Sequence, residues 1–498
     1  MSSFFKKNYL TIFLLIVFFE LLSFFGFLVP FINTLSFFII SLVILIFSLI
    51  RLEYGIYVLL AELFIGSKGH LFYFEIGSIR ISIRMVLFTI VMVSWLIEVI
   101  KRKYKLNFFR SKFFIFYFLF FIFFLWGVFA GLIYKNQKDL IFFDANAWLY
   151  FFLIFPFFDL INERKIIENI LKILTATLSW LAIKTFLIFF FFTHQIKAIM
   201  PDLYYWIRTR GLGEITAIDS FYRVFFQSQI YSLIGFFIFI SFIIFLKNKK
   251  NFYFLFIPTI PLLISFSRSY LLSFILTFLI FLIYLKIKEK FSFFKIGEIF
   301  LIILSVFGLS FAFIWFSLKI PPKIVIDLSS LIEKRIEFEE PAVSSRIIQL
   351  PYLLSAILEK PILGSGFGKT VSYFSRDPRA LERHPLGLYT TYAFEWGYLD
   401  IWLKIGLVGL FVFLLLIWKI FQFGWKMIEI YKSKNENFQK SLILGMLFGL
   451  IALIITHFTS PYLNHPLGIG YLILCTVIFS YKQSSNENIN SNRYLEFS

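Results

Sequence analysis

The sequence predicts an all-α, polytopic integral membrane protein with about 12 to 14 transmembrane helices. Of its 498 residues, 60% are hydrophobic and only 15% are charged, whereas soluble globular chains carry roughly 25% charged residues. The apolar residues gather in repeated runs near the roughly 20 residues that a helix needs to cross a bilayer. Between these runs the lysines and arginines form short clusters, as they do in the connections of helical membrane proteins.

Fourteen apolar runs are candidate spans. Three of them (36–50, 54–66 and 252–266) are shorter than the usual ~17 residues, so we expect tilted, re-entrant or hairpin segments there. The first run follows a basic start, and no clear small-residue cleavage site comes after it, which predicts a retained span. In chain order the runs lie near 9–30, 36–50, 54–66, 85–99, 112–134, 146–161, 168–193, 228–246, 252–266, 270–285, 297–318, 398–420, 441–458 and 466–481.

The basic clusters predict the orientation, because cytoplasmic connections carry the excess of Lys and Arg. With a cytoplasmic N-terminus and fourteen spans, all six clusters fall on the cytoplasmic side: 6–7, 101–105, 162–165, 247–250, 286–290 and 432–440. The same alternation puts the connections 194–227, 267–269, 319–397 and 459–465 on the extracytoplasmic side.

The segment 319–397 is the one large connection between spans, and we expect one or two amphipathic helices in it. Ile347, Leu353 and Ile357 repeat there at helical spacing. We expect residues 1–482 to form a polytopic membrane domain, and the polar residues 483–498 to form a disordered cytoplasmic tail.

Other residue types exclude several kinds of function. The net charge of +19 follows the positive-inside pattern, so we expect no nucleic-acid partner. The single cysteine, Cys475, excludes an intramolecular disulfide, and the five histidines show no metal-ligand spacing, so we expect no metal. Glu20, Glu62 and Lys184 lie inside apolar runs, and we expect such charges to pair between helices.

Three arginines near the predicted outer surface are candidate anion-binding residues. Arg268 separates two apolar runs, where an arginine is costly unless it meets a polar cavity, a headgroup or an anionic partner. Arg346 begins the amphipathic segment, and Arg223 precedes a span. For Arg268 and Arg223 the structural alternative is an interfacial side chain that reaches lipid phosphates. For Arg346 it is a salt bridge to Glu339 or Glu340.

Two further residues are candidate general bases. Glu395 stands at the start of the span 398–420, and His384 stands eleven residues before it. A carboxylate in that place is either a solvated residue favoured by the helix dipole or a base that takes a proton from a substrate hydroxyl. His384 is either a loop histidine or a catalytic one.

The stretch EKPILGSGFGKTVSYF (359–374) resembles a phosphate-binding loop at first sight. A P-loop requires a glycine five positions before Gly368, and Leu363 stands there instead. The predicted topology also puts the stretch outside the cytoplasm, away from any ATP pool. We interpret Gly364, Gly366 and Gly368 as a tight turn that shapes an outer cavity, since glycine permits backbone paths that side chains obstruct.

Three ordered motifs in the region of about 262–420 resemble the O-antigen ligase and O-antigen polymerase superfamily of bacterial envelope glycosyltransferases. They are SFSRSYLLSFIL after a short span, SSRIIQLPYLLSAILEKPILGSGFG in the large loop, and EWGYLDIWLKIGLVGL at the next span. The family shows Ser-Arg at a hairpin tip, an Arg that leads into a helix, a Pro-x-x-Gly-x-Gly turn, and His-Asn-x-Tyr-Leu before Gly-Leu-x-Gly. Here Glu395 and Trp396 stand where the family has His and Asn.

The resemblance implies roles for the candidate residues. Arg268 and Arg346, with Arg223 as a third, match arginines thought to bind the diphosphate of a lipid carrier. Glu395 stands at the position of the proposed base, so either it or His384 would activate the acceptor hydroxyl. A third possibility is a diverged member with another reaction or none.

The implied activity is that of a glycosyltransferase that needs neither a metal nor ATP, because a diphosphate-sugar is already activated. No cofactor is expected. The donor would be a glycan on undecaprenyl diphosphate and the acceptor a lipid or a glycan, as in lipopolysaccharide or polysaccharide biosynthesis. The reaction would take place among membrane lipids at the outer face of the bacterial inner membrane.

The alternative function is a transporter or flippase for a lipid-linked glycan or another anionic solute. It predicts polar residues at mid-membrane depth and related halves of the chain. A large outer loop that carries the conspicuous residues favours surface chemistry instead. The residues do not separate a ligase from a polymerase, because both use the same donor and differ in the acceptor.

Overall fold

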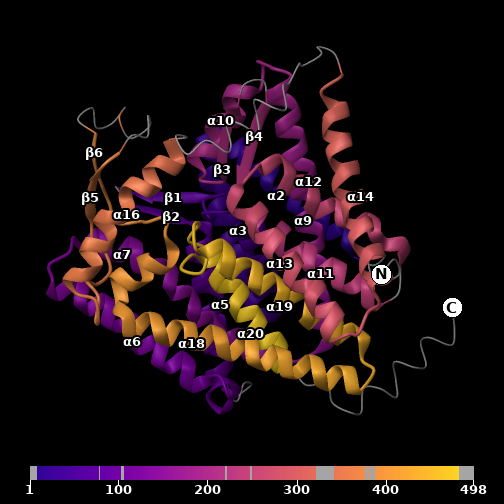
Figure 1. The fold of residues 1–498 in the computed structure, drawn as a ribbon. Coiled ribbons are helices and arrows are strands. Elements are labelled where there is room, and N and C mark those ends of the chain that lie inside the picture. The colour runs from indigo at the N-terminus through magenta and orange to yellow at the C-terminus, as the bar shows by residue number, and fades with distance from the viewer. Residues whose placement is uncertain are drawn as a thin grey trace.

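Membrane-length helices dominate the structure, a computed structural model that describes residues 8–77, 79–101, 106–218, 221–246, 249–320, 341–375, 381 and 387–481 (Figure 1). Among these residues eleven helical segments are long and apolar enough to cross a membrane, and two shorter apolar helices accompany them, Asn251–Ser265 and Pro466–Ser480. Each of the fourteen predicted runs overlaps a described helix. The all-α, polytopic fold class is therefore confirmed.

The first part of the chain contains two hairpins among its helices. Its elements are α2 (Tyr9–Leu28), α3 (Pro30–Ile50), α4 (Leu52–Ile65), β1 (Tyr73–Ile76), β2 (Ile79–Ser82), α5 (Ile83–Ile100), η1 (Asn107–Arg110), α6 (Phe114–Ile133), α7 (Lys138–Asn146), η2 (Ala147–Leu153), α8 (Ile154–Leu160), α9 (Arg164–Thr193), α10 (Met200–Thr209), β3 (Gly213–Ile218), β4 (Phe221–Phe226) and η3 (Gln227–Gln229).

The second part adds a third hairpin and the longest helix. Its elements are α11 (Ile230–Phe245), η4 (Lys249–Leu255), α12 (Phe256–Ser265), α13 (Arg268–Ile287), α14 (Phe293–Ser317), α16 (Pro341–Glu359), β5 (Val371–Phe374), β6 (Leu388–Thr391), α18 (Gly397–Ser433), α19 (Asn437–His457) and α20 (Pro466–Ser480).

The three antiparallel hairpins were not predicted. β1 pairs with β2, β3 with β4 and β5 with β6, and each sheet has two strands. Strands of four to six residues leave little alternating pattern in a sequence this apolar. Several helix boundaries also differ from prediction, and two of them have a clear physical reason. α3 begins at Pro30 rather than 36, since proline suits the first helical position. α18 continues to Ser433 rather than 420, because Gly424, Met427 and Tyr431 keep burying one face.

The core lies around α11 and α19, whose central parts are almost enclosed. Every residue of α11 from Ile230 to Ile243 is buried, and so is 78% of the most apolar 18-residue stretch of α19. By contrast, α2, α3 and α14 each bury less than a third of their own most apolar stretch. Their exposed leucines and phenylalanines, such as Leu14 and Phe294, match a lipid-facing surface.

Contacts between connections divide the helix ends into two groups. At one end Lys440 Nζ lies 2.9 Å from Glu289 Oε2, and Lys432 Nζ donates to the Lys288 carbonyl oxygen. At the other end of α13 the Ser269 and Thr459 hydroxyl groups lie 2.9 Å apart. The first group contains predicted cytoplasmic connections and the second contains predicted outer ones. The structure therefore separates these connections as the charge pattern predicts.

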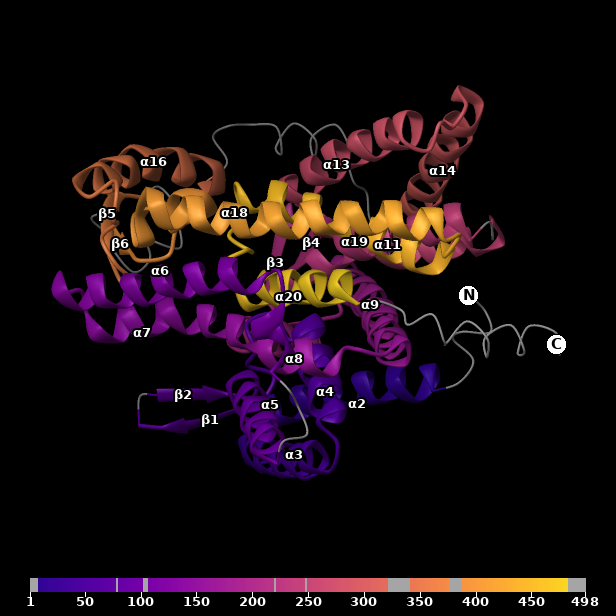
Figure 2. The same cartoon turned by 90° about the horizontal axis from the view of Figure 1, so that it is seen from below.

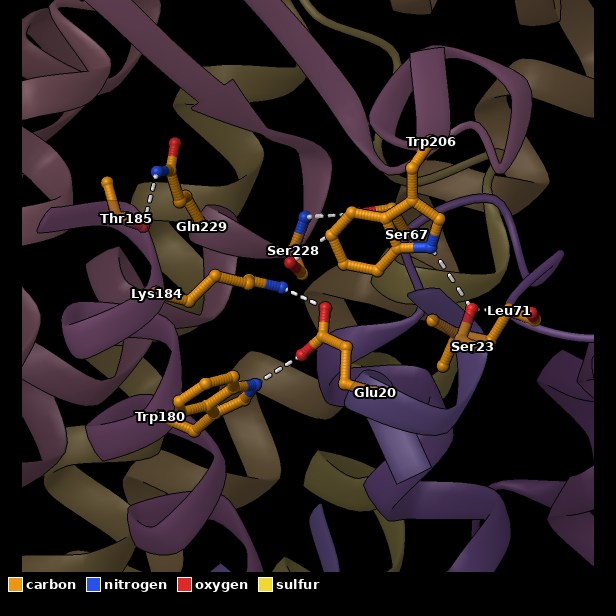
Figure 3. Close-up of polar contacts among 10 residues, drawn as sticks. All are labelled: Glu20, Ser23, Ser67, Leu71, Trp180, Lys184, Thr185, Trp206, Ser228 and Gln229. Carbon is orange, nitrogen blue, oxygen red and sulfur yellow. Dashed lines mark hydrogen bonds and ion pairs between the residues drawn. The ribbon is translucent and has the colours of Figure 1, made fainter. Parts of the chain in front are cut away.

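The three charged residues expected to pair inside the apolar helices do so. Figure 3 shows Glu20 of α2 between Lys184 and Trp180 of α9, with an ion pair to Lys184 and a hydrogen bond from Trp180. Glu62 of α4 pairs with Arg84 of α5, with Arg84 Nε 2.8 Å from Glu62 Oε2. Such pairs compensate the cost of holding a charge at membrane depth.

Candidate functional site

Four candidate residues lie at one end of the bundle, where α13 begins and α19 ends. Arg268 is the first residue of α13, and Glu395 lies two residues before α18. The start of α18 touches the end of α19, because a Cβ on Gly397 would lie 2.3 Å from the His457 carbonyl oxygen. His384, the other candidate base, lies outside the described residues.

Arg346 and Glu395 form an ion pair through Arg346 Nε and Glu395 Oε2. The Arg346 side chain is 28% exposed and that of Glu395 is 53% exposed, so both groups remain accessible to solvent or ligand. The indole of Trp396 donates to the backbone carbonyl of Arg346 at 3.1 Å and thereby fixes the loop against α16. The alternative partners predicted for Arg346, Glu339 and Glu340, lie outside the described residues.

A small second core holds α16 in place beside α18. Leu353 and Ile357 of α16 pack with Val371, Phe394 and Leu403, and all five are buried. Figure 2 shows α16 and the β5–β6 hairpin beside the N-terminal half of α18. The predicted amphipathic helix is therefore present, and its apolar face positions the guanidinium of Arg346 over the start of α18.

Arg223 and Arg268 occupy neighbouring elements at the same end. Arg223 of β4 is half-buried, and its Nε donates to the Ser265 carbonyl oxygen at 2.7 Å. Ser265 ends α12, and Arg268 begins α13 three residues later. A cation at a helix N-terminus is opposed by the helix dipole, so an anion bound beside Arg268 would stabilise this arrangement.

The glycine stretch forms hydrogen bonds to both sides of a break in α18. Gly406 interrupts that helix with φ 75° and ψ 175°. Ser365 and Gly366 donate their N–H groups to the carbonyl oxygens of Leu403 and Lys404, which end the first segment, at 2.7 and 3.0 Å. In return, Leu407 at the start of the second segment donates to the Pro361 carbonyl oxygen at 2.9 Å. The loop thus caps both sides of the break.

Within this loop, the backbone N–H groups of the three glycines and of the two residues between them all donate to the protein. The Gly364 N–H donates to Lys360, and Phe367 donates to Gly127, at 3.0 and 2.9 Å. The Gly368 N–H donates to Asp144 Oδ2 at 2.9 Å. All N–H groups from Gly364 to Gly368 therefore have partners within the protein. The geometry supports the conclusion that this stretch is a structural turn rather than a nucleotide loop.

A buried network of charged side chains lies next to the glycine stretch, and it was not predicted from the sequence. Lys404 Nζ lies 2.5 Å from Asp144 Oδ1 and 2.7 Å from Asp400 Oδ1. Asn464 donates to Asp400 Oδ2 at 2.6 Å, which adds the α19–α20 connection. The signal was present, since Asp400 and Lys404 are four residues apart in a run of apolar residues. Their partner Asp144 is distant in sequence and only the fold brings it near.

The described residues contain no group of three or more His, Cys, Asp or Glu side chains that could hold a metal ion. The site is instead defined by cations and one accessible carboxylate. Arginine is the side chain best suited to bidentate contact with phosphate oxygens. The fold and site therefore define a polytopic membrane protein that presents arginines and a carboxylate at one end of its bundle.

Comparison with known families is consistent with this class of protein. Residues 252–414 match the family model described as O-Antigen ligase. This match confirms the resemblance to the O-antigen ligase and polymerase superfamily. Arg268, Arg346 and Glu395 lie inside the matched segment, and Arg223 lies before it. No curated protein matches the chain.

Proposed function

We propose that this protein transfers a glycan from undecaprenyl diphosphate to a lipid or glycan acceptor at the outer face of the bacterial inner membrane. The family match supports O-antigen ligase or polymerase activity in general. The observation that supports the finer proposal most is the ion pair between Arg346 and Glu395. It places a side chain suited to binding phosphate next to a side chain that can accept a proton.

The ion pair suggests an order of events. A donor diphosphate would compete with Glu395 for the Arg346 guanidinium, since both are anions of similar geometry. Binding of the donor would then release the carboxylate to face the acceptor hydroxyl. In this way the arginine would be occupied before the donor arrives, and the base would become available only afterwards.

The proposed transfer needs no cofactor, because each bond that forms is matched by one that breaks. The acceptor oxygen forms a bond to the anomeric carbon, and the bond from that carbon to the phosphate oxygen breaks. The diphosphate leaves with the electron pair, and Arg268, Arg346 and Arg223 stabilise its charge. The acceptor proton passes to Glu395, or to His384 if that residue is the base. Direct displacement inverts the anomeric configuration.

A deletion strain tests the proposal through its surface glycans. We expect loss of long glycan chains, visible on gels of the extracted lipid-linked glycan, and recovery when the gene is returned. Loss of every chain from the anchor indicates a ligase, and single repeat units left on the anchor indicate a polymerase. Unchanged glycans in the deletion strain would contradict the proposal.

The identity of the base is tested by Glu395→Gln. We expect transfer to fall by at least about 100-fold, because a positioned general base contributes roughly that much. The KM for the donor should fall at the same time, since the amide no longer competes for Arg346. The measurement is steady-state transfer by purified protein. Retained activity in Glu395→Gln together with loss in His384→Ala would assign the base to His384.

A further inference from the structure

A second group of cationic side chains lies outside the matched segment, around the connection between α4 and α5. Lys68 and His70 lie in that connection, Arg80 lies on β2, and Arg210 caps the end of α10. Burial, and to a smaller extent the charges of Arg84, Arg80, Lys68 and Arg210, together lower the pKa of His70 to about 4. The Lys68 side chain lies against Gly211, the residue after Arg210, since a Cβ on Gly211 would lie 3.0 Å from Lys68 Cδ.

Arg210 is the unusual member, because its charge is buried without full compensation. It is only 2% exposed, and its Nη1 donates to Asn33 Oδ1 at 2.7 Å. Its guanidinium lies 4.6 Å from the ring centre of Tyr73, and that of Arg80 lies 4.3 Å from the same ring. Arg210 Nε has no hydrogen-bond partner. A buried guanidinium without a carboxylate partner adds positive potential to its surroundings.

The nearby carboxylates do not cancel the positive charge. Glu62 is occupied by Arg84 at 2.8 Å, and Glu75 is occupied by Arg80 at 2.7 Å. Arg210 and the exposed Lys68 have no carboxylate partner among the described residues. Four cations face two carboxylates, which leaves two net positive charges at this place.

Rigid contacts hold the group together. Figure 3 shows two contacts at the connection after α4: Ser23 donates to the Leu71 carbonyl oxygen at 2.7 Å, and Trp206 donates to Ser23. Arg84 Nη1 donates to the Ser67 carbonyl oxygen at 2.6 Å. These contacts fix the backbone that carries Lys68 and His70, and they hold Arg84 in place beside it.

The surroundings indicate that the ligand is a lipid. Ile76 at the tip of the β1–β2 hairpin is 58% exposed, and Phe31 at the start of α3 is 72% exposed. Asn33, which holds Arg210, lies one half-turn after Phe31. Exposed apolar residues beside a cationic group are typical of the boundary between the hydrocarbon core and the headgroups.

We propose that Lys68 and Arg80 form a second anion site, which binds the phosphate group of a lipid at the membrane surface. Arg210 supplies the positive potential behind these two residues without contacting the ligand. The phosphate belongs to a phosphorylated acceptor or to a neighbouring phospholipid. Only the assignment to the acceptor rests on the function proposed above.

Lipid binding is measured on the purified full chain in neutral detergent, by the thermal shift with dihexanoylphosphatidic acid. We expect a concentration-dependent rise in Tm, and none with dihexanoylphosphatidylcholine or with inorganic phosphate at equal concentration. The Lys68→Gln/Arg80→Gln double variant should bind the phosphatidic acid at least about tenfold more weakly. Both residues are accessible, so the Tm without lipid should be unchanged.

The matched control is Arg208→Gln. Arg208 is an exposed arginine on α10 that pairs with Glu214 at 3.1 Å. It removes one positive charge at the same end and should leave the lipid-induced shift intact. Equal binding by wild type and double variant, or equal shifts with both lipids, would overturn the proposal. The readout needs no transfer activity, so it stands apart from the proposed function.

Transfer kinetics in bilayers of phosphatidylcholine then distinguish the two sources of phosphate. An acceptor KM raised several-fold in the double variant, with kcat and donor KM unchanged, assigns the site to the acceptor. An unchanged acceptor KM, with phosphatidic acid binding lost, assigns it to a neighbouring phospholipid. Either result supports the second anion site, and failure of Arg268→Ala to impair transfer would count only against the proposed donor site.

Discussion

Replacing Arg268 by Ala should reduce glycan transfer by at least about 100-fold while the protein remains in the membrane at its normal level. The expected loss is large because this guanidinium would meet the charge that develops on the departing diphosphate. Arg346→Ala should have an effect of the same size, and it should also release Glu395 from its ion pair. Surface glycan and transfer by the purified variants measure both effects.

Arg51→Ala is the matched control for these variants. Arg51 is an exposed arginine that pairs with Glu53 at 3.0 Å, in the connection between α3 and α4. It should leave transfer unchanged. Arg268→Lys should recover only part of the activity, since lysine keeps the charge and loses the bidentate geometry. Full surface glycan in both Arg268→Ala and Arg346→Ala, at wild-type protein levels, would reject their assignment to the diphosphate.

Replacing Gly366 by Ala should destabilise the fold by about 2–5 kcal/mol and abolish transfer indirectly. Gly366 has φ +79°, and a Cβ there would lie 2.1 Å from the backbone nitrogen of Gly131. The three nearest atoms all belong to the backbone of Ala130 and Gly131, which cannot move aside easily, so the loop would have to leave the break in α18. The apparent Tm of the purified protein and its elution profile in detergent measure the effect.

Gly308→Ala separates this effect from the general loss of a glycine. Gly308 lies in α14, and a Cβ there meets nothing within 4 Å. The substitution should be neutral or slightly stabilising, because alanine is the better helix former. A Gly366→Ala protein with the Tm of the wild type would show that the loop is not needed to cap the two segments of α18.

The helices and their alternation were predictable because hydrocarbon imposes one solution on an apolar chain. A segment in a bilayer must satisfy its own backbone groups, so each long apolar run becomes a helix. The same reasoning could not find the continuation of α18 to Ser433 or its break at Gly406, since both depend on neighbours. The hairpins were missed for a similar reason, because short strands are stabilised by their partners rather than by their own sequence.

The candidate site was predictable only as a set of residues. Arg223, Arg268, Arg346 and Glu395 were recognisable from their positions at span ends and from motif order. Their relation was not recognisable, since the partner of Arg346 lies 49 residues away. The sequence offered Glu339 and Glu340 as nearer choices. The structure instead places Arg346 against Glu395, through the packing of Leu353 and Phe394 in the second core.

By itself, the sequence determined that this protein is a polytopic helical membrane protein, which connections share a side, and which family its region of about 262–420 resembles. These properties follow from local composition and spacing. Only the tertiary structure decided what each charge meets. It joined Gly364–Gly368 by hydrogen bonds to both sides of the break in α18, and it placed Arg80 and Arg210 against the ring of Tyr73. Charges act through distance, and distances between remote segments are set by packing rather than by the order of residues.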